Sequence, residues 1–320
     1  MKAARRGFVF SLLLILSALK GGPFLFADLK VGIFLDIDSM PLLAARDEGL
    51  FAGEGVAVEL VVFQNPQERD AALQAGRLDG AVSDLLAASF FAAAGFDYKI
   101  TSLTDGRYGI VGSPLSRNRS LAGLKGKRLA LSTNTIIHYA VDTLFEEAGI
   151  PGGSYTAVPA PRMPLRLEMV LSGQVEAAGL PDPLLSVAVS RGAPLLAVID
   201  TSNGGPIDPG VILFSKRVLD TRLEEVRRFY RAFYRAALRI NANQEAYRDY
   251  LVEKVHVPGE LKATYRFINY RRPALPELSQ LEKVFAWLTQ RRLLAVELRP
   301  EELLDSRPVD GLGIEQHIPW

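Results

Sequence analysis

A repeated alternation of short apolar strands with amphipathic helices constrains the fold of this chain more than any other feature of its sequence. The stretch Ser132–Gly149 shows one complete unit. It follows the apolar run Arg128–Ser132, begins with residues that often cap helices, and carries apolar side chains at helical spacing until Gly149 ends the pattern. Strand, polar turn and helix in this order predict a parallel sheet with helices packed on it.

The unit recurs in two series. The first predicts strands at residues 28–35, 56–63, 80–83, 98–103 and 108–112, and the second predicts strands at 128–132, 155–159, 177–180 and 195–199. A last strand is expected at 211–215, after which the chain is helical. Helices are predicted there at residues 223–240, 244–254, 260–267 and 277–292.

Two polar, turn-rich stretches, Ser113–Gly126 and Thr201–Gly210, separate these blocks. They predict a chain that starts in one lobe, crosses to a second and returns. We therefore expect lobe one to comprise residues 28–112 plus 211–320, with the C-terminal helices, and lobe two to comprise residues 113–210 with the hinge segments. A ligand would lie in the cleft between the lobes, gripped by the strand-end turns of both.

Residues 1–27 have the pattern of a secretory signal peptide. Lys2, Arg5 and Arg6 form a basic start, Phe8–Leu19 is apolar, and Ala27 is a small residue at the expected cleavage point. The apolar run is shorter than the roughly 20 residues that span a membrane, although an uncleaved anchor remains the alternative. Because the chain has no cysteine to carry a lipid, we expect a periplasmic protein that is not a lipoprotein.

Composition argues against several classes of function. Beyond residue 27, 33 basic residues stand against 36 acidic ones, which is no signature of nucleic-acid binding. The three histidines, His138, His256 and His317, lack metal-ligand spacing. The arginine-rich face of residues 223–240 is best interpreted as a solvated helix surface. We therefore expect no metal, no cofactor and no nucleic-acid partner.

Five stretches of the chain, taken in their order and spacing, resemble a known family of proteins. They are Val31–Phe63, Ala72–Ala88, Leu121–Thr135, Leu165–Pro183 and Pro209–Asp220. Together they resemble the solute-binding proteins of ABC transporters in the NMT1/THI5-like group, which serves nitrate, taurine, sulfonates and thiamine precursors. The resemblance implies an α/β, two-lobed periplasmic-binding-protein type II fold, with a mostly parallel sheet flanked by helices in each lobe.

The resemblance also implies a function. Such a protein captures a small solute by hinge closure and delivers it to a membrane permease with its ATPase, and we expect it to act as a monomer and not as an enzyme. By position, the ligand-binding residues would be those of the strand-end turns, each of which also serves as an ordinary cap or turn residue. They are Asp36, Asp38, Ser39, Met40, Gln64, Asn65, Ser83, Asp84, Ser132, Asn134, Thr135, His138, Pro181 and Asp182.

The charge of the solute stays open at this point. Asp36, Asp38, Asp84 and Asp182 favour a polar organic solute with donor or cationic groups, such as a pyrimidine or an amine. An anion such as nitrate or a sulfonate would be repelled unless these carboxylates turn away or pair with arginine. Arg162 and Arg166 could clamp such an anion.

Two alternative functions remain. A ligand-sensing partner of a membrane receptor would use the same cleft without transport. A pyrimidine synthase of thiamine biosynthesis belongs to the same group, but it relies on a cysteine-rich motif and histidines. This chain has no cysteine and no evident nucleophile–base pair, which argues against catalysis.

Overall fold

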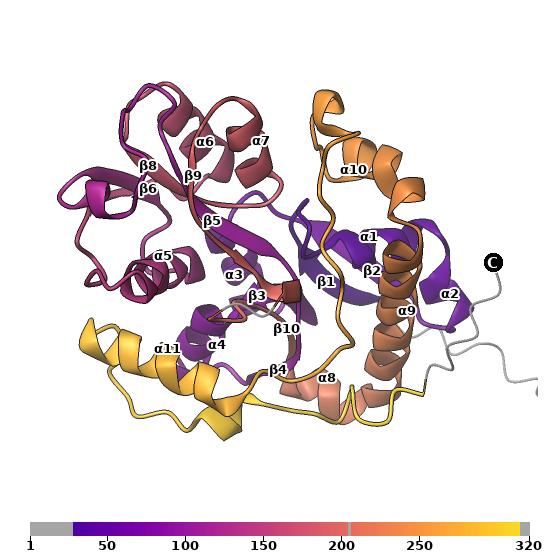
Figure 1. Cartoon of the computed structure of the whole chain (residues 1–320). Coiled ribbons are helices and arrows are strands. Elements are labelled where there is room, and N and C mark those ends of the chain that lie inside the picture. The colour runs from indigo at the N-terminus through magenta and orange to yellow at the C-terminus, as the bar shows by residue number, and fades with distance from the viewer. Residues whose placement is uncertain (1–27, 204–205, 314–320) are drawn as a thin grey trace, which may run out of the picture.

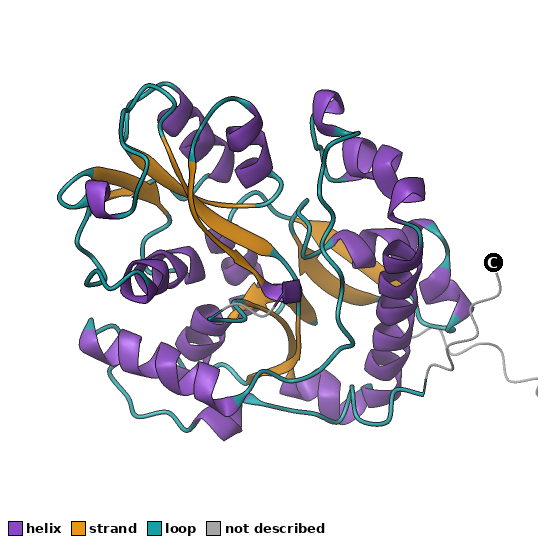
Figure 2. Cartoon of the chain, viewed as in Figure 1, coloured by secondary structure: helices purple, strands orange, loops and turns teal. Residues whose placement is uncertain are grey.

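Two five-stranded sheets, each covered by helices on both faces, form the two lobes of the molecule (Figures 1 and 2). The structure is a computed structural model that describes residues 28–203 and 206–313. The predicted signal peptide, residues 1–27, lies outside the described residues.

The first sheet has the strand order β2-β1-β3-β10-β4. Its strands are β1 (Leu29–Ile33), β2 (Val58–Val62), β3 (Gly80–Asp84), β4 (Tyr98–Leu103) and β10 (Gly210–Ser215). β1 is parallel to β2 and β3, whereas β10 is antiparallel to both of its neighbours. One face packs on α1 (Met40–Asp47), α2 (Leu50–Gly53), α8 (Lys216–Thr221) and α9 (Leu223–Ala242), and the other packs on α3 (Pro66–Gln74) and α4 (Leu85–Ala93).

The second sheet repeats this plan with the strand order β7-β6-β8-β5-β9. Its strands are β5 (Arg107–Gly112), β6 (Arg128–Leu131), β7 (Thr156–Pro159), β8 (Ala177–Pro181) and β9 (Leu195–Asp200). β5 is the antiparallel strand here, in the place that β10 takes in the first sheet. One face packs on α5 (Ile136–Glu147) and the other on α6 (Met163–Leu171) and α7 (Leu184–Ser190).

The chain passes between the sheets at residues 104–106, from β4 to β5, and at residues 201–209, from β9 to β10. The sequence analysis placed β5 with the first series, in lobe one. Instead β5 pairs with β8 and β9 in the second sheet. Strand periodicity identifies a strand but does not say which sheet it joins, because that depends on pairing with residues far along the chain.

The C-terminal region returns along the first lobe and then touches both. α9 is followed by α10 (Arg248–Lys254), a 3₁₀ turn at Gly259–Leu261, an extended stretch, and α11 (Leu278–Gln290). The predicted helix at residues 260–267 is therefore wrong beyond its first turn. Its carbonyl groups have partners outside it, since Arg248 Nη1 donates to the carbonyls of Lys262 (2.7 Å) and Tyr265 (3.2 Å).

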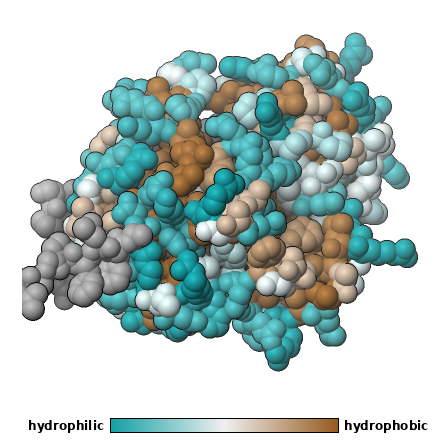
Figure 3. Space-filling view, turned by 180° about the vertical axis from the view of Figure 1, so that it is seen from behind, coloured by the Kyte–Doolittle hydropathy of each residue, from teal (hydrophilic) through white to brown (hydrophobic). Residues whose placement is uncertain are grey.

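The arginine-rich face of α9 is a surface of ion pairs. Arg231 and Arg235 each lie 2.8 Å from Glu54, and Arg239 lies 2.7 Å from Glu48. No helix among the described residues combines the length and apolarity needed to cross a membrane. Seen from behind, the surface is largely hydrophilic, with apolar side chains gathered in separate patches (Figure 3).

We predict that Phe214→Ala lowers the free energy of unfolding by about 3–5 kcal/mol, because it leaves a cavity at the centre of the first lobe. Phe214 is fully buried on β10, with its ring 5.3 Å from that of Phe229. Urea unfolding measures the loss. Val62→Ala, at an exposed position on β2, is the control and should change stability little. A loss below about 1 kcal/mol for the Phe214 variant would contradict the packing described here.

Candidate functional site

A cavity lies between the lobes, where the carboxyl ends of strands from both sheets face each other. It measures about 60 Å³, well below the roughly 300–1,000 Å³ of pockets that hold drug-sized ligands. Its walls come from both lobes. The lining residues are Phe34, Asp36, Asp38, Pro66, Arg69, Val82, Ser83, Asp84, Tyr108, Ser132, Thr135, Ile136, Ile137, Met163, Arg166, Pro181 and Gly210.

Half of the residues predicted from the sequence line this cavity. They are Asp36, Asp38, Ser83, Asp84, Ser132, Thr135 and Pro181. All of them lie at or just beyond the carboxyl end of a strand, in the position that the strand–turn–helix pattern indicated.

The other seven predicted residues do not line the cavity. Ser39 is at the N-cap position of α1 without a capping bond from its side chain, and its N–H donates to Asp36 Oδ1 (3.0 Å). Asn65 caps α3 by accepting from the N–H of Glu68 (3.0 Å). The remaining members of this group are Met40 in the apolar core, the exposed Gln64 and Asn134, His138 against an aromatic cluster, and Asp182.

Asp182 is held by groups that sequence reasoning did not connect with it. Arg107 Nη1 donates to its Oδ2 (2.8 Å), as does the hydroxyl of Tyr265 (3.1 Å). Its Oδ1 accepts from the N–H (2.9 Å) and the hydroxyl (2.8 Å) of Ser186. The carboxylate therefore ties α7, β5 and the C-terminal segment together and has no free acceptor directed at the cavity.

Asp38 links the two lobes beside the crossings at residues 104–106 and 201–209. Its Oδ2 accepts from the hydroxyl of Thr104 (2.9 Å) and from that of Tyr108 on the other lobe. Burial, followed by the neighbouring Asp36, raises the pKa of Asp38 well above its usual range. A Cβ atom at Gly106 or Gly210 would collide with this carboxyl group, so glycine at both crossings lets it approach the backbone.

Two buried arginines occupy equivalent places in the two lobes. Pro66–Asp84 and Met163–Pro181 each begin with a nine-residue helix, end with a five-residue strand and place arginine fourth. Arg69 Nη1 donates to the carbonyl of Val82 (3.2 Å), and Arg166 Nη1 donates to that of Gly179 (2.7 Å). Both carbonyls belong to the middle residue of the strand.

The two arginines differ in their charge partners. Arg69 lies 2.8 Å from Asp70 and 3.6 Å from Asp84. Arg166 is 1% exposed, and no carboxylate of the described residues lies within ion-pair distance of it. Burial alone lowers the pKa of Arg166 to about 10.

Four polar atoms that face this cavity lack a hydrogen-bond partner. They are Arg69 Nη2, Ser83 Oγ, Ser132 Oγ and Arg166 Nε. Arg69 Nη2 is nevertheless within ion-pair distance of Asp70, so the two hydroxyls and Arg166 are the groups left free. Buried polar atoms are rarely left without a partner in native proteins, so their convergence indicates a place for a ligand with acceptor atoms.

The sequence analysis considered Arg166 as a clamp for an anion but did not include it among the predicted ligand-binding residues. The signal that was missed is a repeated segment. Each copy has a helix with arginine in its second turn, then a glycine, and then a strand. Side chains of a helix lean towards its N-terminus. Arginines at that position therefore reach back to the strand ends, where the cavity lies.

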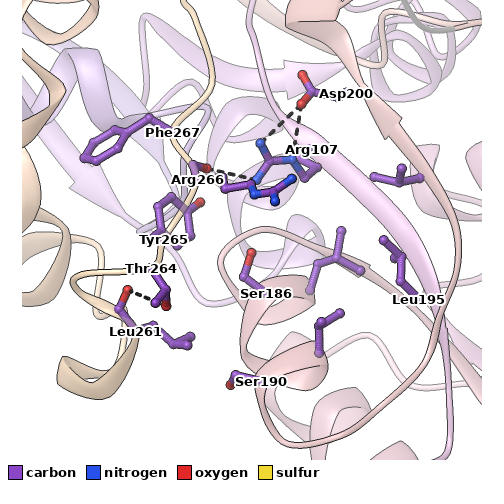
Figure 4. Close-up of a pocket in the computed structure, with 13 residues that line it drawn as sticks. Arg107, Ser186, Ser190, Leu195, Asp200, Leu261, Thr264, Tyr265, Arg266 and Phe267 are labelled. Carbon is purple, nitrogen blue, oxygen red and sulfur yellow. Dashed lines mark hydrogen bonds and ion pairs between the residues drawn. The ribbon is translucent and has the colours of Figure 1, made fainter.

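A larger cavity, of about 660 Å³, lies on another side of the lobe interface, between α7, β9 and residues 261–267 (Figure 4). Two of the charged groups around it are bonded to each other, since Arg107 contacts Asp200 (3.2 Å), and Arg107 also donates to the carbonyl of Arg266 (3.1 Å). None of the described residues that line it has a buried side-chain polar atom without a hydrogen-bond partner, so the smaller cavity is the stronger candidate site.

Among the described residues, no group of three or more His, Cys, Asp or Glu side chains could hold a metal ion. The cavity between the lobes is instead a hydrogen-bonding site with hydroxyl, guanidinium and carboxyl groups.

A family model described as NMT1/THI5 like matches residues 36–246. The chain belongs to this family. Solved structures similar to this NMT1/THI5-like protein share its two-lobed fold, which confirms the fold class expected from the sequence. No curated protein matches the sequence.

Three solved structures illustrate the likeness. The alkanesulfonate-binding protein SsuA from Xanthomonas axonopodis pv. citri, bound to MOPS, has a TM-score of 0.72 and 19% identity, covering 87% of this chain and 98% of its own. The ligand-binding component of an ABC-type import system from Staphylococcus aureus has a TM-score of 0.72 and 14% identity, with coverages of 90% and 99%. The nitrate-binding protein NrtA from Synechocystis PCC 6803 has a TM-score of 0.68 and 15% identity, with coverages of 86% and 84%. At these identities, the likeness shows the fold.

We predict that Asp36 makes this protein less stable as the pH rises from about 4 to about 6. Burial raises the pKa of Asp36 from 3.8 to about 6. The unfolded chain then releases this proton at lower pH than the folded chain does, so stability is lost across that window and is constant above it. Asp36→Asn keeps an acceptor for the N–H of Ser39 and removes the titration.

Urea unfolding of both proteins between about pH 4 and pH 8 separates the titration of Asp36, together with its effect on the neighbouring Asp38, from the titrations that the two proteins share. The free energy of unfolding of the parent minus that of the variant should fall up to about pH 6 and then level off. A difference that is flat or rises through this range would contradict the burial of Asp36 in the cleft.

Proposed function

We propose that this protein is the solute-binding component of an ABC importer, which captures a small polar solute between its lobes in the periplasm and delivers it to a membrane permease. Membership of the NMT1/THI5-like family supports a binding role. The neighbouring structures include binding proteins for alkanesulfonates and nitrate and a component of an import system. The predicted signal peptide at residues 1–27 agrees with export.

The observation that carries the proposal is the uncompensated charge of Arg166. A fully buried guanidinium without a carboxylate partner is costly. The cost is offset if the solute brings an anionic group, because arginine donates bidentate hydrogen bonds to planar acids. The free hydroxyls of Ser83 and Ser132 add donors from both lobes. We therefore propose a small solute with an acidic group.

Three of the four carboxylates named in the sequence analysis are bonded to other side chains. Asp84 pairs with Arg69, Asp38 is bonded to Thr104 and Tyr108, and Asp182 is held by Arg107. Asp84 and Asp182 therefore meet the condition set by the sequence analysis, namely pairing with arginine. Burial raises the pKa of both Asp36 and Asp38, which favours their uncharged forms. We prefer an acidic solute to a cationic one for this reason.

The size of the cavity requires the lobes to move. A cavity of about 60 Å³ that is lined from both sides does not admit an organic solute from solvent while the lobes are closed. The lobes are joined by the two crossings at residues 104–106 and 201–209, which lie close together. Rotation about these crossings would open the cleft, and a solute that contacts both lobes would favour closure.

We predict that a thermal-shift screen of the full chain finds stabilisation by small acids. The compounds to test are nitrate, sulfonates, carboxylates, amines, amino acids, riboflavin and thiamine precursors. A ligand that binds only the folded state raises the Tm. Stabilisation by amines alone, with none by any acid, would overturn the proposed solute class.

The second arm of this test compares two arginines of the same helix region. Arg166→Gln keeps a donor for the carbonyl of Gly179 and should weaken binding of the stabilising acid roughly 10- to 100-fold, as expected for the loss of a charged hydrogen bond. The Tm of the ligand-free variant should not fall, because a buried unpaired charge is removed. Arg162→Gln, at an exposed position four residues earlier, should bind like the parent. Equal binding by all three proteins would place the solute elsewhere.

A further inference from the structure

Residues 274–305 form a strap whose two ends are fixed to lobe one. At its start, the carbonyl of Ala274 accepts from the N–H of Leu103 on β4 (2.8 Å). At its end, the N–H of Asp305 donates to the carbonyl of Ile100 on the same strand (3.0 Å). The side chain of Lys99 adds a bond to the carbonyl of Glu302 (2.9 Å). α11 lies between these anchors, along the lower edge of the view in Figure 1.

The last turn of α11 reaches a buried carboxylate of lobe two. Asp142 on α5 is fully buried, and its Oδ2 accepts from the indole N–H of Trp287 (2.8 Å) and from the guanidinium of Arg291. Its Oδ1 accepts from the hydroxyl of Tyr155 (2.8 Å) and the N–H of Gly153 (2.8 Å). Half of the donors to this carboxylate therefore come from the strap and half from lobe two itself.

The same contact supports the turn that leads into the ligand cavity. The ring of Trp287 meets the rings of His138 (5.2 Å between centroids) and Tyr139 (5.8 Å) edge to face. His138 Nδ1 in turn accepts from the N–H of Asn134 (3.2 Å). Asn134 lies between Ser132 and Thr135, which line the cavity.

We propose that α11 is a latch between the lobes, in which Trp287 and Asp142 stabilise the closed state and act as positioning residues for the Ser132–Thr135 turn. Because both ends of the strap are bonded to β4, opening of the hinge separates α11 from α5. The separation takes two donors from a buried carboxylate, which is unfavourable. The effect of the latch on solute affinity rests on the hinge closure proposed above, whereas the latch itself can be tested without any solute.

The test measures the distance between the lobes in the ligand-free full chain. The chain has no cysteine, so Gln74→Cys on lobe one and Gln174→Cys on lobe two, both at exposed positions, provide two unique sites for spin labels. Double electron–electron resonance then gives the distribution of interlobe distances. Trp287→Phe and Asp142→Asn, each in this labelled parent, remove the indole donor and the carboxylate charge.

Two controls separate the latch from general destabilisation. Tyr230→Phe removes a buried hydrogen bond to Thr101 (2.6 Å) that lies wholly within lobe one. Glu282→Gln changes an exposed position on α11 itself. Neither should alter the interlobe distances. Circular dichroism and thermal unfolding of every variant verify that it is folded.

We expect both latch variants to shift the distribution towards longer distances, with an open-to-closed ratio about fivefold higher, as for the loss of one hydrogen bond. Distributions of the folded latch variants that superimpose on that of the parent would overturn the latch. So would an equal shift in the Tyr230 control, because the change would then report stability alone. Failure of the acid screen would leave this result unaffected, since no ligand is present.

Discussion

The architecture depends on one topological constraint. In each sheet, the antiparallel strand follows directly after a segment in which the chain crosses between the lobes. β5 enters the second sheet immediately after residues 104–106, and β10 enters the first sheet immediately after residues 201–209. Both β5 and β10 are hydrogen-bonded to a neighbouring strand on each side. The sheet of each lobe therefore extends as far as the crossings. Asp38 sits at this point, bonded to Thr104 and Tyr108 across the crossing. The strand ends of both lobes consequently converge on one cavity.

Within that cavity, the distribution of buried charge has more functional meaning than the number of charges. The two lobes place Arg69 and Arg166 in equivalent positions, each bonded to the carbonyl of the middle residue of the next strand. In lobe one, the positions around the arginine are Asp70 and Asp84, whereas their counterparts in lobe two are Leu167 and Pro181. One arginine is therefore neutralised by the protein and the other is not. This duplicated plan with one unbalanced charge is the basis of the acidic solute proposed above.

The C-terminal region makes contacts on two sides of the crossings between the lobes. On one side, Arg271 bonds to Asp105 and to Asp208 (2.7 Å), one from each crossing, and Tyr265 reaches Asp182 of lobe two. On the other side, α11 reaches Asp142. These carboxylates are spaced far apart in the sequence, yet each accepts from the C-terminal region. The tail of the chain is thus a set of connections between the lobes as well as a covering of lobe one.

The sequence by itself determined the local elements and the class of fold. Alternating apolar strands and capped helices predict each unit of both sheets, and polar residues at strand ends such as Asp36, Ser83 and Ser132 were correctly expected to lie at the carboxyl edges. These features depend on residues that are close together in the sequence, so the spacing of apolar and polar residues is enough to predict them. The assignment of β5 to the second sheet, the extended path of residues 262–277, and the engagement of Asp182 by Arg107 were decided only by tertiary structure. So was the isolation of Arg166, because whether a buried charge has a partner depends on side chains brought together from distant parts of the chain.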